Sequence, residues 1–209
     1  MNHKKVPRLM QEMNLKSIIR RKTKAKPQGD GLPPLVAENL LNRDFSAAAP
    51  KQKWVTDITQ YAVGETWLYL SAIKDLCTKE IVSYQMSLRN NTQLVLDTFE
   101  QVLKKGEDVP DLIVHSDQGC QYTSHAYHNM LNQVSAKISM SRRGNCYDNA
   151  AMESFFSHLK AEALYPYSIG SLEDAQERIH AFIHYYNHER IQLKLNKLAP
   201  IDYRNQLTA

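Results

Sequence analysis

Residues 111–119 read DLIVHSDQG, and this stretch decides the fold class. The three apolar residues 112–114, bounded by Pro110 and by polar residues, are typical of a short central strand that is buried on both faces. Asp117 directly follows the full strand Leu-Ile-Val-His-Ser, at the carboxyl end, where α/β sheets hold their ligands. Gly119 allows a backbone or a substrate to approach the turn closely. The stretch therefore predicts an α/β fold with a polar site at the end of a central strand.

The segments on either side supply the rest of the sheet and the helices that cover it. Alternating and β-branched residues predict three strands in an antiparallel meander and one later strand, over 54–59, 66–73, 80–87 and 136–140. Helical spacing of apolar residues predicts four helices, over 92–105, 124–133, 150–164 and 172–188. This order of elements indicates a mixed sheet covered by helices on both faces.

The composition excludes several classes of protein. No run of about 18 apolar residues occurs, so we expect no membrane span. The amino-terminal stretch MNHKKVPRLM lacks the apolar core of a signal peptide, which indicates a cytoplasmic protein. The three cysteines are too scattered for a paired zinc site, and their odd number does not suit a closed disulfide framework.

Charge is distributed unevenly along the chain. Residues 1–53 hold 12 Lys/Arg against 4 Asp/Glu, whereas the remaining residues hold 14 against 18. Apolar residues at helical spacing predict a basic helix over 4–20, and the prolines and glycines of 27–50 predict a linker with one helical turn over 36–42. A basic arm on a mildly acidic body is common in proteins that bind phosphate backbones, but a solvated tail would look the same.

Three acidic residues are candidates for a metal site. Asp57 lies in the middle of a predicted strand and shares a face with Val55, and a carboxylate in such a covered position needs a cation or a close partner. Asp117 follows the central strand. Glu153 lies in the first turn of the helix over 150–164, on the same face as Lys160 seven residues later. The alternative for Glu153 is a simple interaction with the helix dipole.

The chemistry of these side chains indicates which metal they would hold. Carboxylate oxygens, without a Cys or a clear set of His ligands, favour Mg²⁺ or Mn²⁺ over zinc. Such a cluster can hold two ions about 3.5–4 Å apart. His180, His184 and His188 are spaced four residues apart and such a stripe can bind zinc, but no residue is placed to complete the shell, and a polar helix face explains them as well.

Four blocks in this order resemble the insertion-sequence OrfB transposases, which have a retroviral-integrase-type catalytic core. The blocks are WVTDITQY (54–61), HSDQGCQYTS (115–124), RGNCYDNAAMESFFSHLKAE (143–162) and YYNHERIQLKLNKLAPIDYR (185–204). The resemblance implies an RNase H-like core with a five-stranded mixed sheet over 51–209. It also implies an Asp-Asp-Glu triad on Asp57, Asp117 and Glu153 that binds Mg²⁺ or Mn²⁺.

The implied reaction is cleavage and joining of DNA in the transposition of a mobile element. Hydrolysis exposes a 3′-hydroxyl at the element end, and that hydroxyl then attacks a second phosphodiester. The expected partners are element-end and target DNA and other copies of the chain on that DNA, with the protein from an upstream reading frame as a further candidate, all in the bacterial cytoplasm at the nucleoid. The expected DNA contacts come from the core and from the basic arm: Lys160, Arg143, Asn149, Lys4, Lys5, Arg8, Arg20, Arg21 and Lys22.

The sequence departs from the family at its beginning. Met1 falls just before what resembles the last helix of a helix-turn-helix region, so residues 1–26 are interpreted as a remnant of that region, shortened at its N-terminus. An alternative function follows: a catalytically silent DNA-binding remnant that regulates transposition. A third hypothesis, a cellular RNase H-like nuclease, requires a preference for RNA–DNA hybrids.

Overall fold

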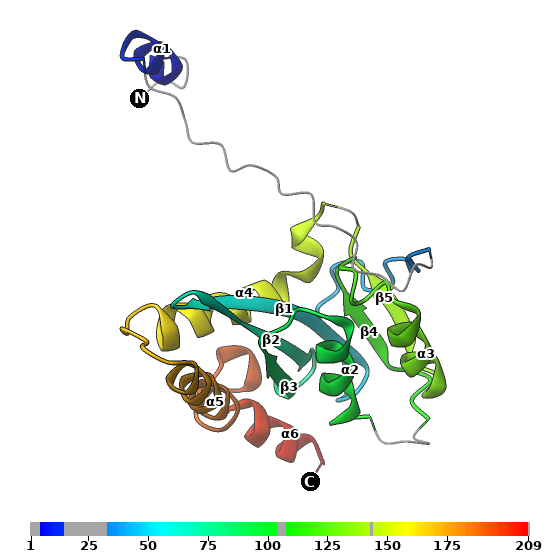
Figure 1. The fold of residues 1–209 in the computed structure, drawn as a ribbon. Helices are drawn as coiled ribbons and strands as arrows, with labels where there is room; N and C mark the ends of the chain where they lie inside the picture. Colours follow the sequence, from blue (N-terminus) through cyan, green and yellow to red (C-terminus); the bar gives the residue numbers. More distant parts are fainter. Residues whose placement is uncertain (1–4, 15–32, 104–107, 143, 209) are drawn as a thin grey trace.

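A computed structural model of the chain describes residues 5–14, 33–103, 108–142 and 144–208 (Figure 1). Its centre is a five-stranded sheet in the order β3-β2-β1-β4-β5. The strands are β1 (Lys53–Val63), β2 (Thr66–Asp75), β3 (Ile81–Ser87), β4 (Ile113–Ser116) and β5 (Lys137–Met140). β1, β2 and β3 form an antiparallel meander, and β4 and β5 run parallel to β1. The mixed five-stranded sheet expected from the sequence is confirmed.

Helices cover both faces of this sheet, as Figure 1 shows. Trp54 and Val55 are neighbours in β1 and point to opposite faces, so each joins a different hydrophobic cluster. The Trp54 cluster lies under α2 and α3, and the Val55 cluster lies under α4 and α5. The bounds of these helices are α2 (Thr92–Glu100), α3 (His125–Gln133), α4 (Ala150–Leu159) and α5 (Leu172–His188). No helix in the described part of the chain is long and apolar enough to cross a membrane.

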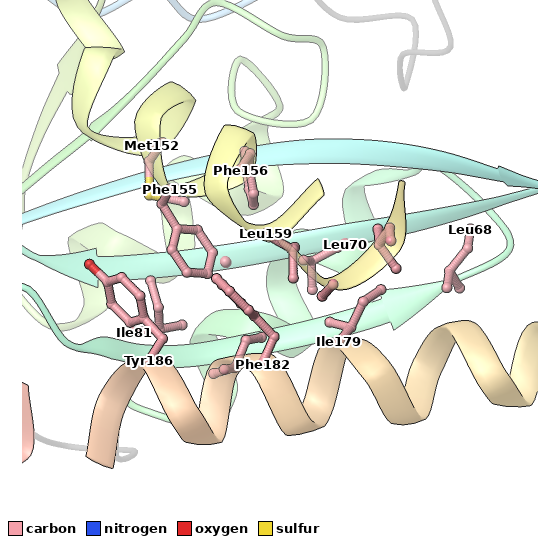
Figure 2. Packing of buried hydrophobic residues seen from close by; sticks show 14 of the residues in the cluster. Leu68, Leu70, Ile81, Met152, Phe155, Phe156, Leu159, Ile179, Phe182 and Tyr186 are labelled. Carbon is pink, nitrogen blue, oxygen red and sulfur yellow. The ribbon is translucent and has the colours of Figure 1, made fainter. Parts of the chain in front are cut away.

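Aromatic side chains fix α4 against the sheet and α5. Figure 2 shows Phe155 of α4 packed between the sheet and the side chains of Phe182 and Tyr186. The Phe155 ring centroid lies 6.2 Å from that of Phe182 and 5.0 Å from that of Tyr186. Truncating such a buried ring costs about 3–5 kcal/mol. This packing determines which face of α4 remains free, and Glu153 lies on that free face.

The helix predicted over 150–164 changes character part-way. It is α-helical to Leu159 and continues as a π-helical turn, Lys160–Leu164, in which the Tyr165 amide donates to the Lys160 carbonyl at 2.8 Å. Such π turns occur mostly as local insertions in α-helices, and frequently at functional sites. Lys160 therefore begins a segment whose side-chain directions differ from those of a regular helix.

Residues 33–50 differ from the predicted linker. Part of this segment lies beside β5, where the Met140 amide donates to the Glu38 carbonyl at 3.2 Å, and a turn follows at 41–43. Leu41 is only 1% exposed and belongs to the hydrophobic core. The predicted helical turn over 36–42 is absent from this described segment, because its backbone groups bond to β5 instead. Residues 27–32 lie outside the described residues, and the packed body thus begins well before Lys51.

The chain ends contain two further helices. α1 (Lys5–Glu12) is shorter than the helix predicted over 4–20: Asn14 has a φ of 52°, which ends the helix, and residues 15–20 lie outside the described part. α6 (Pro200–Thr208) was not predicted as a separate helix, and Arg204 joins it to Glu80 through hydrogen bonds of 2.7 and 2.8 Å. The helix predicted over 92–105 ends at Glu100, and Asn91 caps its start by accepting a 3.1 Å hydrogen bond from the Leu94 amide.

Candidate active site

The register of two parallel strands places Asp57 beside Asp117. Val55 of β1 pairs with His115 of β4. The next residue that projects from the same face is two positions further along each strand, which is Asp57 in one case and Asp117 in the other. Residues 60 positions apart in the chain are thereby brought to the same face of the sheet, the face that α4 covers.

Asp57 is a partly buried carboxylate without a salt bridge among the described residues. Its Oδ1 accepts a 2.8 Å hydrogen bond from the Ile58 amide, and no salt bridge joins it to a Lys or Arg among the described residues. Burial, followed by the charge of Asp117, raises the pKa of Asp57 to about 7. The nearby charge of Lys160 acts in the opposite direction. The positive charge of Lys160 therefore offsets the burial of Asp57 only in part.

Asp117 is exposed just after the end of β4, in a turn where Gly119 lies close to its carboxylate. Its Oδ1 accepts a 2.8 Å hydrogen bond from the Gly119 amide. A Cβ atom at Gly119 would lie 2.9 Å from that same oxygen, so a larger residue would displace the carboxylate. Partial withdrawal of the Asp117 carboxyl group from water raises its pKa, and the hydrogen bond from Gly119 lowers it.

Glu153 comes to the site on the exposed face in the first turn of α4. Asn149, immediately before this helix, is 4% exposed, and its Nδ2 donates a 3.1 Å hydrogen bond to the Thr56 carbonyl of β1. This hydrogen bond connects the start of α4 to the residue beside Asp57. Asn149 Oδ1 is buried and has no hydrogen-bond partner among the described residues. Asn149 therefore positions the helix that carries Glu153.

All three predicted acids line one cavity of about 470 Å³. Asp57 comes from the middle of β1, Asp117 from the end of β4, and Glu153 from α4. The rest of the lining is mostly polar: Gln118, Gly119, Ser141, Arg142, Gly144, Asn145 and Asn149. Gln118, Ser141 and Asn145 were not among the predicted site residues, because their local sequence patterns are those of ordinary turn and loop residues.

The three carboxylates line the same cavity but are not close enough together to coordinate one metal ion. Among the described residues, no group of three or more His, Cys, Asp or Glu side chains is gathered closely enough to hold a metal ion. Two of the three acids turn an oxygen toward a backbone amide instead, and like charges without a cation repel one another. Their chemistry nevertheless fits Mg²⁺ or Mn²⁺, because all three supply hard oxygen ligands.

The residues expected to contact DNA have different positions. Lys160 is partly buried near Asp57; burial lowers its pKa, and the charge of Asp57 raises it. Lys5 and Arg8 are exposed on α1, where Arg8 forms a 3.3 Å salt bridge with Glu12. The remaining basic candidates lie outside the described residues: Lys4, Arg20, Arg21, Lys22 and Arg143.

Beside the cavity lies a second buried carboxylate, Asp148, which was not singled out from the sequence. Its side chain is 0% exposed and accepts hydrogen bonds from Arg142, Arg43 and Asn39 at 2.8–3.1 Å. Arg142 above all, and then Arg43, hold the pKa of Asp148 well below its usual range. Two partners lie more than 100 residues away in the chain, so no local sequence signal indicates this cluster.

The histidines that resembled a zinc stripe form separate contacts. His180 Nδ1 lies 2.7 Å from the Tyr84 hydroxyl, and the rings of His184 and His188 stack with centroids 4.3 Å apart. His115 is fully buried between two serines, with Ser139 Oγ at 2.8 Å from Nδ1 and Ser141 Oγ at 3.0 Å from Nε2. Burial lowers the pKa of His115 to about 4, so this ring is neutral at pH 7.

Two solved viral integrase structures have a similar fold. The HTLV-2 integrase catalytic core domain, solved in complex with magnesium, superimposes with a TM-score of 0.59 at 14% identity, covering 76% of this chain and 99% of that one. A chain of the simian T-cell lymphotropic virus intasome superimposes with a TM-score of 0.63 at 14% identity, covering 86% of this chain and 60% of that one. The sheet and helices therefore have the RNase H-like fold of integrase cores, as the sequence predicted.

Sequence comparisons identify closer relatives. The family described as integrase core domain matches residues 47–146, and a second family with the same description matches 153–207. An uncharacterised transposase-like protein of Haemophilus influenzae is 45% identical over 98% of this chain and 94% of its own length. The putative transposase InsK for insertion sequence element IS150 of Escherichia coli is 42% identical over 98% of this chain and 72% of its own length. The chain belongs to the insertion-sequence transposases with an integrase-type core.

Proposed function

We propose that this chain cleaves and joins DNA in a divalent-metal-dependent transposition reaction. One observation carries the proposal: three carboxylates from separate elements line a single cavity, and Asp57 forms no salt bridge among the described residues. A carboxylate withdrawn from water without a partner is costly, and a bound cation removes that cost. The relatives named as transposases support DNA as the substrate.

Asp57, Asp117 and Glu153 would hold one or two Mg²⁺ or Mn²⁺ ions. When bound, such ions activate the attacking hydroxyl and stabilise the leaving oxygen. The chain itself supplies position: the β1–β4 register sets the two aspartates, and Asn149 holds the start of α4 through the Thr56 carbonyl. Precise positioning of reactants accounts for much of the rate in phosphoryl transfer.

The reaction consists of two in-line displacements at phosphorus. In the first, a water oxygen bonds to phosphorus and the bond to the 3′-oxygen breaks, which leaves a 5′-phosphate and a 3′-hydroxyl after proton transfer. In the second, that 3′-hydroxyl bonds to a target phosphorus, and the target 3′-oxygen leaves and takes a proton. Both steps exchange one phosphorus–oxygen bond for another, so no external energy source is required.

DNA contacts are assigned to residues around and before the core. Lys160 is placed near Asp57, and Lys5 and Arg8 are exposed on α1. We assign the same role to Arg143 and to the basic residues Lys4, Arg20, Arg21 and Lys22. Asn149 is buried, so we assign it to positioning α4 rather than to direct contact with DNA. Assembly of several copies on DNA is in keeping with the intasome neighbour.

The decisive assay supplies a labelled element end with Mg²⁺ or Mn²⁺ and follows cleavage and strand transfer. Asp117→Asn and Glu153→Gln should abolish both steps. Asp111→Asn is the matched control for the first variant, because Asp111 lies just before the opposite end of β4 and its side chain is 94% exposed. Glu173→Gln controls for the second, because Glu173 is an exposed acid in the first turn of α5.

The outcomes separate the proposed roles. If Glu153→Gln and Glu173→Gln lose equally little activity, Glu153 interacts only with the helix dipole. If the unaltered chain binds element-end DNA with a steep salt dependence but cuts it with neither metal, the chain is a regulator instead. A preference for RNA–DNA hybrids over element ends would indicate a cellular nuclease.

A further inference from the structure

Arg142 is the only Lys or Arg among the described residues that line the candidate active-site cavity. It directly follows Ser141, whose amide donates to the Ser116 carbonyl at 2.8 Å, so its backbone is anchored to the end of β4. The Arg142 amide itself donates to Asp148 Oδ2 at 3.1 Å. The main chain at this position is therefore held from two sides.

Asp148 also holds the Arg142 side chain in one orientation. Arg142 Nε donates to Asp148 Oδ2 at 3.0 Å, and Nη2 donates to Oδ1 at 3.1 Å. This two-pronged pairing fixes the plane of the guanidinium group as well as its position. The accepting carboxylate is fully buried, whereas the Arg142 side chain is 58% exposed. The arginine is thus fixed at its inner edge and open to solvent at its outer edge.

The outer edge retains hydrogen-bond donors. A guanidinium group has five N–H donors, and the pairing with Asp148 uses two of them. Within the described residues, no hydrogen bond engages Nη1. A planar group with unused donors on one edge matches two oxygens of a phosphate. The orientation costs little entropy on binding, because Asp148 has already restricted the side chain.

The charge balance of the cluster also favours an anion. Asp148 carries one negative charge between Arg142 and Arg43, and Arg43 Nε lies 2.8 Å from Asp148 Oδ1. The three groups together have a net charge of +1. The other charges on the cavity wall are the three carboxylates, which repel a phosphodiester. Arg142 is therefore the side chain of this cavity wall that attracts the phosphates of a DNA backbone.

We propose that Arg142, oriented by Asp148, binds a phosphate of the DNA substrate at the mouth of the cavity. This inference rests on the proposed function, since it takes DNA as the substrate. Asp148 is then a positioning residue: it does not line the cavity, and it acts through Arg142. The neighbouring Arg143, singled out from the sequence, lies outside the described residues.

The matched control is Arg43, because both arginines form a salt bridge with the same buried carboxylate and only Arg142 lines the cavity. The measurement is the affinity of the full chain for a fluorescent element-end duplex, by anisotropy over a series of salt concentrations without divalent metal. Arg142→Gln should weaken binding about tenfold and reduce the slope of log K against log salt by about one. Arg43→Gln should leave both nearly unchanged.

A second variant separates orientation from charge. Asp148→Asn makes the chain more positive, so a purely electrostatic effect would strengthen DNA binding. If orientation of the Arg142 guanidinium group matters, Asp148→Asn should weaken DNA binding instead. Arg142→Lys should also bind DNA more weakly than the unaltered chain, because an ammonium group lacks the planar arrangement of donors. Near-UV circular dichroism of each variant checks that the fold is retained.

Two outcomes would overturn the inference. One is an equal loss of affinity in Arg142→Gln and Arg43→Gln, which would assign both arginines to folding alone. The other is an unchanged salt slope in Arg142→Gln. DNA binding is measured without metal, so it tests the phosphate contact separately from catalysis. If the unaltered chain does not cleave DNA but Arg142→Gln still weakens DNA binding, the proposed catalytic function is refuted and the phosphate contact stands. If the unaltered chain cleaves DNA but Arg142→Gln binds DNA as tightly as the unaltered chain, the phosphate contact is refuted and the catalytic function stands.

Discussion

Asp57 and Asp148 are two carboxylates at the same end of the sheet with opposite surroundings. Asp148 is fully buried and has two arginines and an asparagine as partners, whereas Asp57 is partly buried and forms no salt bridge among the described residues. The pKa of Asp148 is lowered and that of Asp57 is raised to about 7. Asp148 is thus compensated by two salt bridges, whereas Asp57 accepts a hydrogen bond from the Ile58 amide and has no salt bridge among the described residues.

The strongest test of this difference neutralises Asp57 and Asp148 in separate variants and measures both DNA cleavage and the free energy of unfolding. Asp57→Asn should lower DNA cleavage more than about a thousandfold, equivalent to about 4 kcal/mol of transition-state stabilisation, because a metal ligand is lost. The metal-free protein should become more stable at pH 8, because an uncompensated charge is removed. A strand-transfer assay and urea denaturation give the two quantities, and retained activity would contradict the assignment of Asp57.

Asp148→Ala should have the opposite effect on stability. Removing this partner leaves two arginines without their acceptor, and we expect a loss of about 2–3 kcal/mol. That figure lies below the cost of about 3–5 kcal/mol for breaking a fully buried ion pair, because Arg43 and Arg142 remain partly exposed. Urea denaturation measures the change in the free energy of unfolding. Asp44→Asn is the control, since Asp44 is an exposed acid that forms a salt bridge with Lys53. An equal effect in both variants would refute the distinction.

The two carboxylates should also give opposite pH dependence. The folded-state pKa of Asp57 lies above its unfolded value of 3.8, so the folded protein binds more protons and stability falls as pH rises from about 4 to 7. The pKa of Asp148 is lowered, so its contribution is complete above about pH 4 and is lost as pH falls further. His115 opposes Asp57 in the same window.

The pH effect of Asp57 is therefore isolated by difference. Urea denaturation of the unaltered chain and of Asp57→Asn between pH 4 and 8 should show that Asp57→Asn gains stability relative to the unaltered chain as pH rises, by about 1–3 kcal/mol. Parallel pH profiles in the two proteins would show that Asp57 has an ordinary pKa. Asp111→Asn serves as the exposed control.

A further expected effect is stabilisation by metal. Mg²⁺ at about one hundred times its dissociation constant should raise the free energy of unfolding by about 2.7 kcal/mol at most, and less where it must displace protons. The gain should therefore increase with pH through about 7 and vanish in Asp57→Asn. Differential scanning fluorimetry with Mg²⁺, and with Na⁺ at equal ionic strength, measures it. Equal shifts with the two cations would argue against a specific site.

Much of the fold was predictable because its signals are local. The five strands follow from alternating or continuous apolar residues, and the α3 and α5 bounds agree with their predictions to within one residue. α6 and the true end of α2 were not predicted. The sequence of 33–50 predicts a linker, because its prolines disfavour helices and strands. In the structure, this segment instead packs against β5 through hydrogen bonds in both directions. Its partners lie about 100 residues away and leave no local pattern.

The sequence by itself determined the candidate acids, because each stands out in its local element: Asp57 inside a strand, Asp117 at a strand end, and Glu153 in a first helical turn. Only the tertiary structure decided that these residues line one cavity, and that Asp148 rather than Asp57 receives the arginines. The physical reason is distance. Period and turn chemistry act over a few residues, whereas burial and charge pairing depend on groups that meet only when the chain is folded.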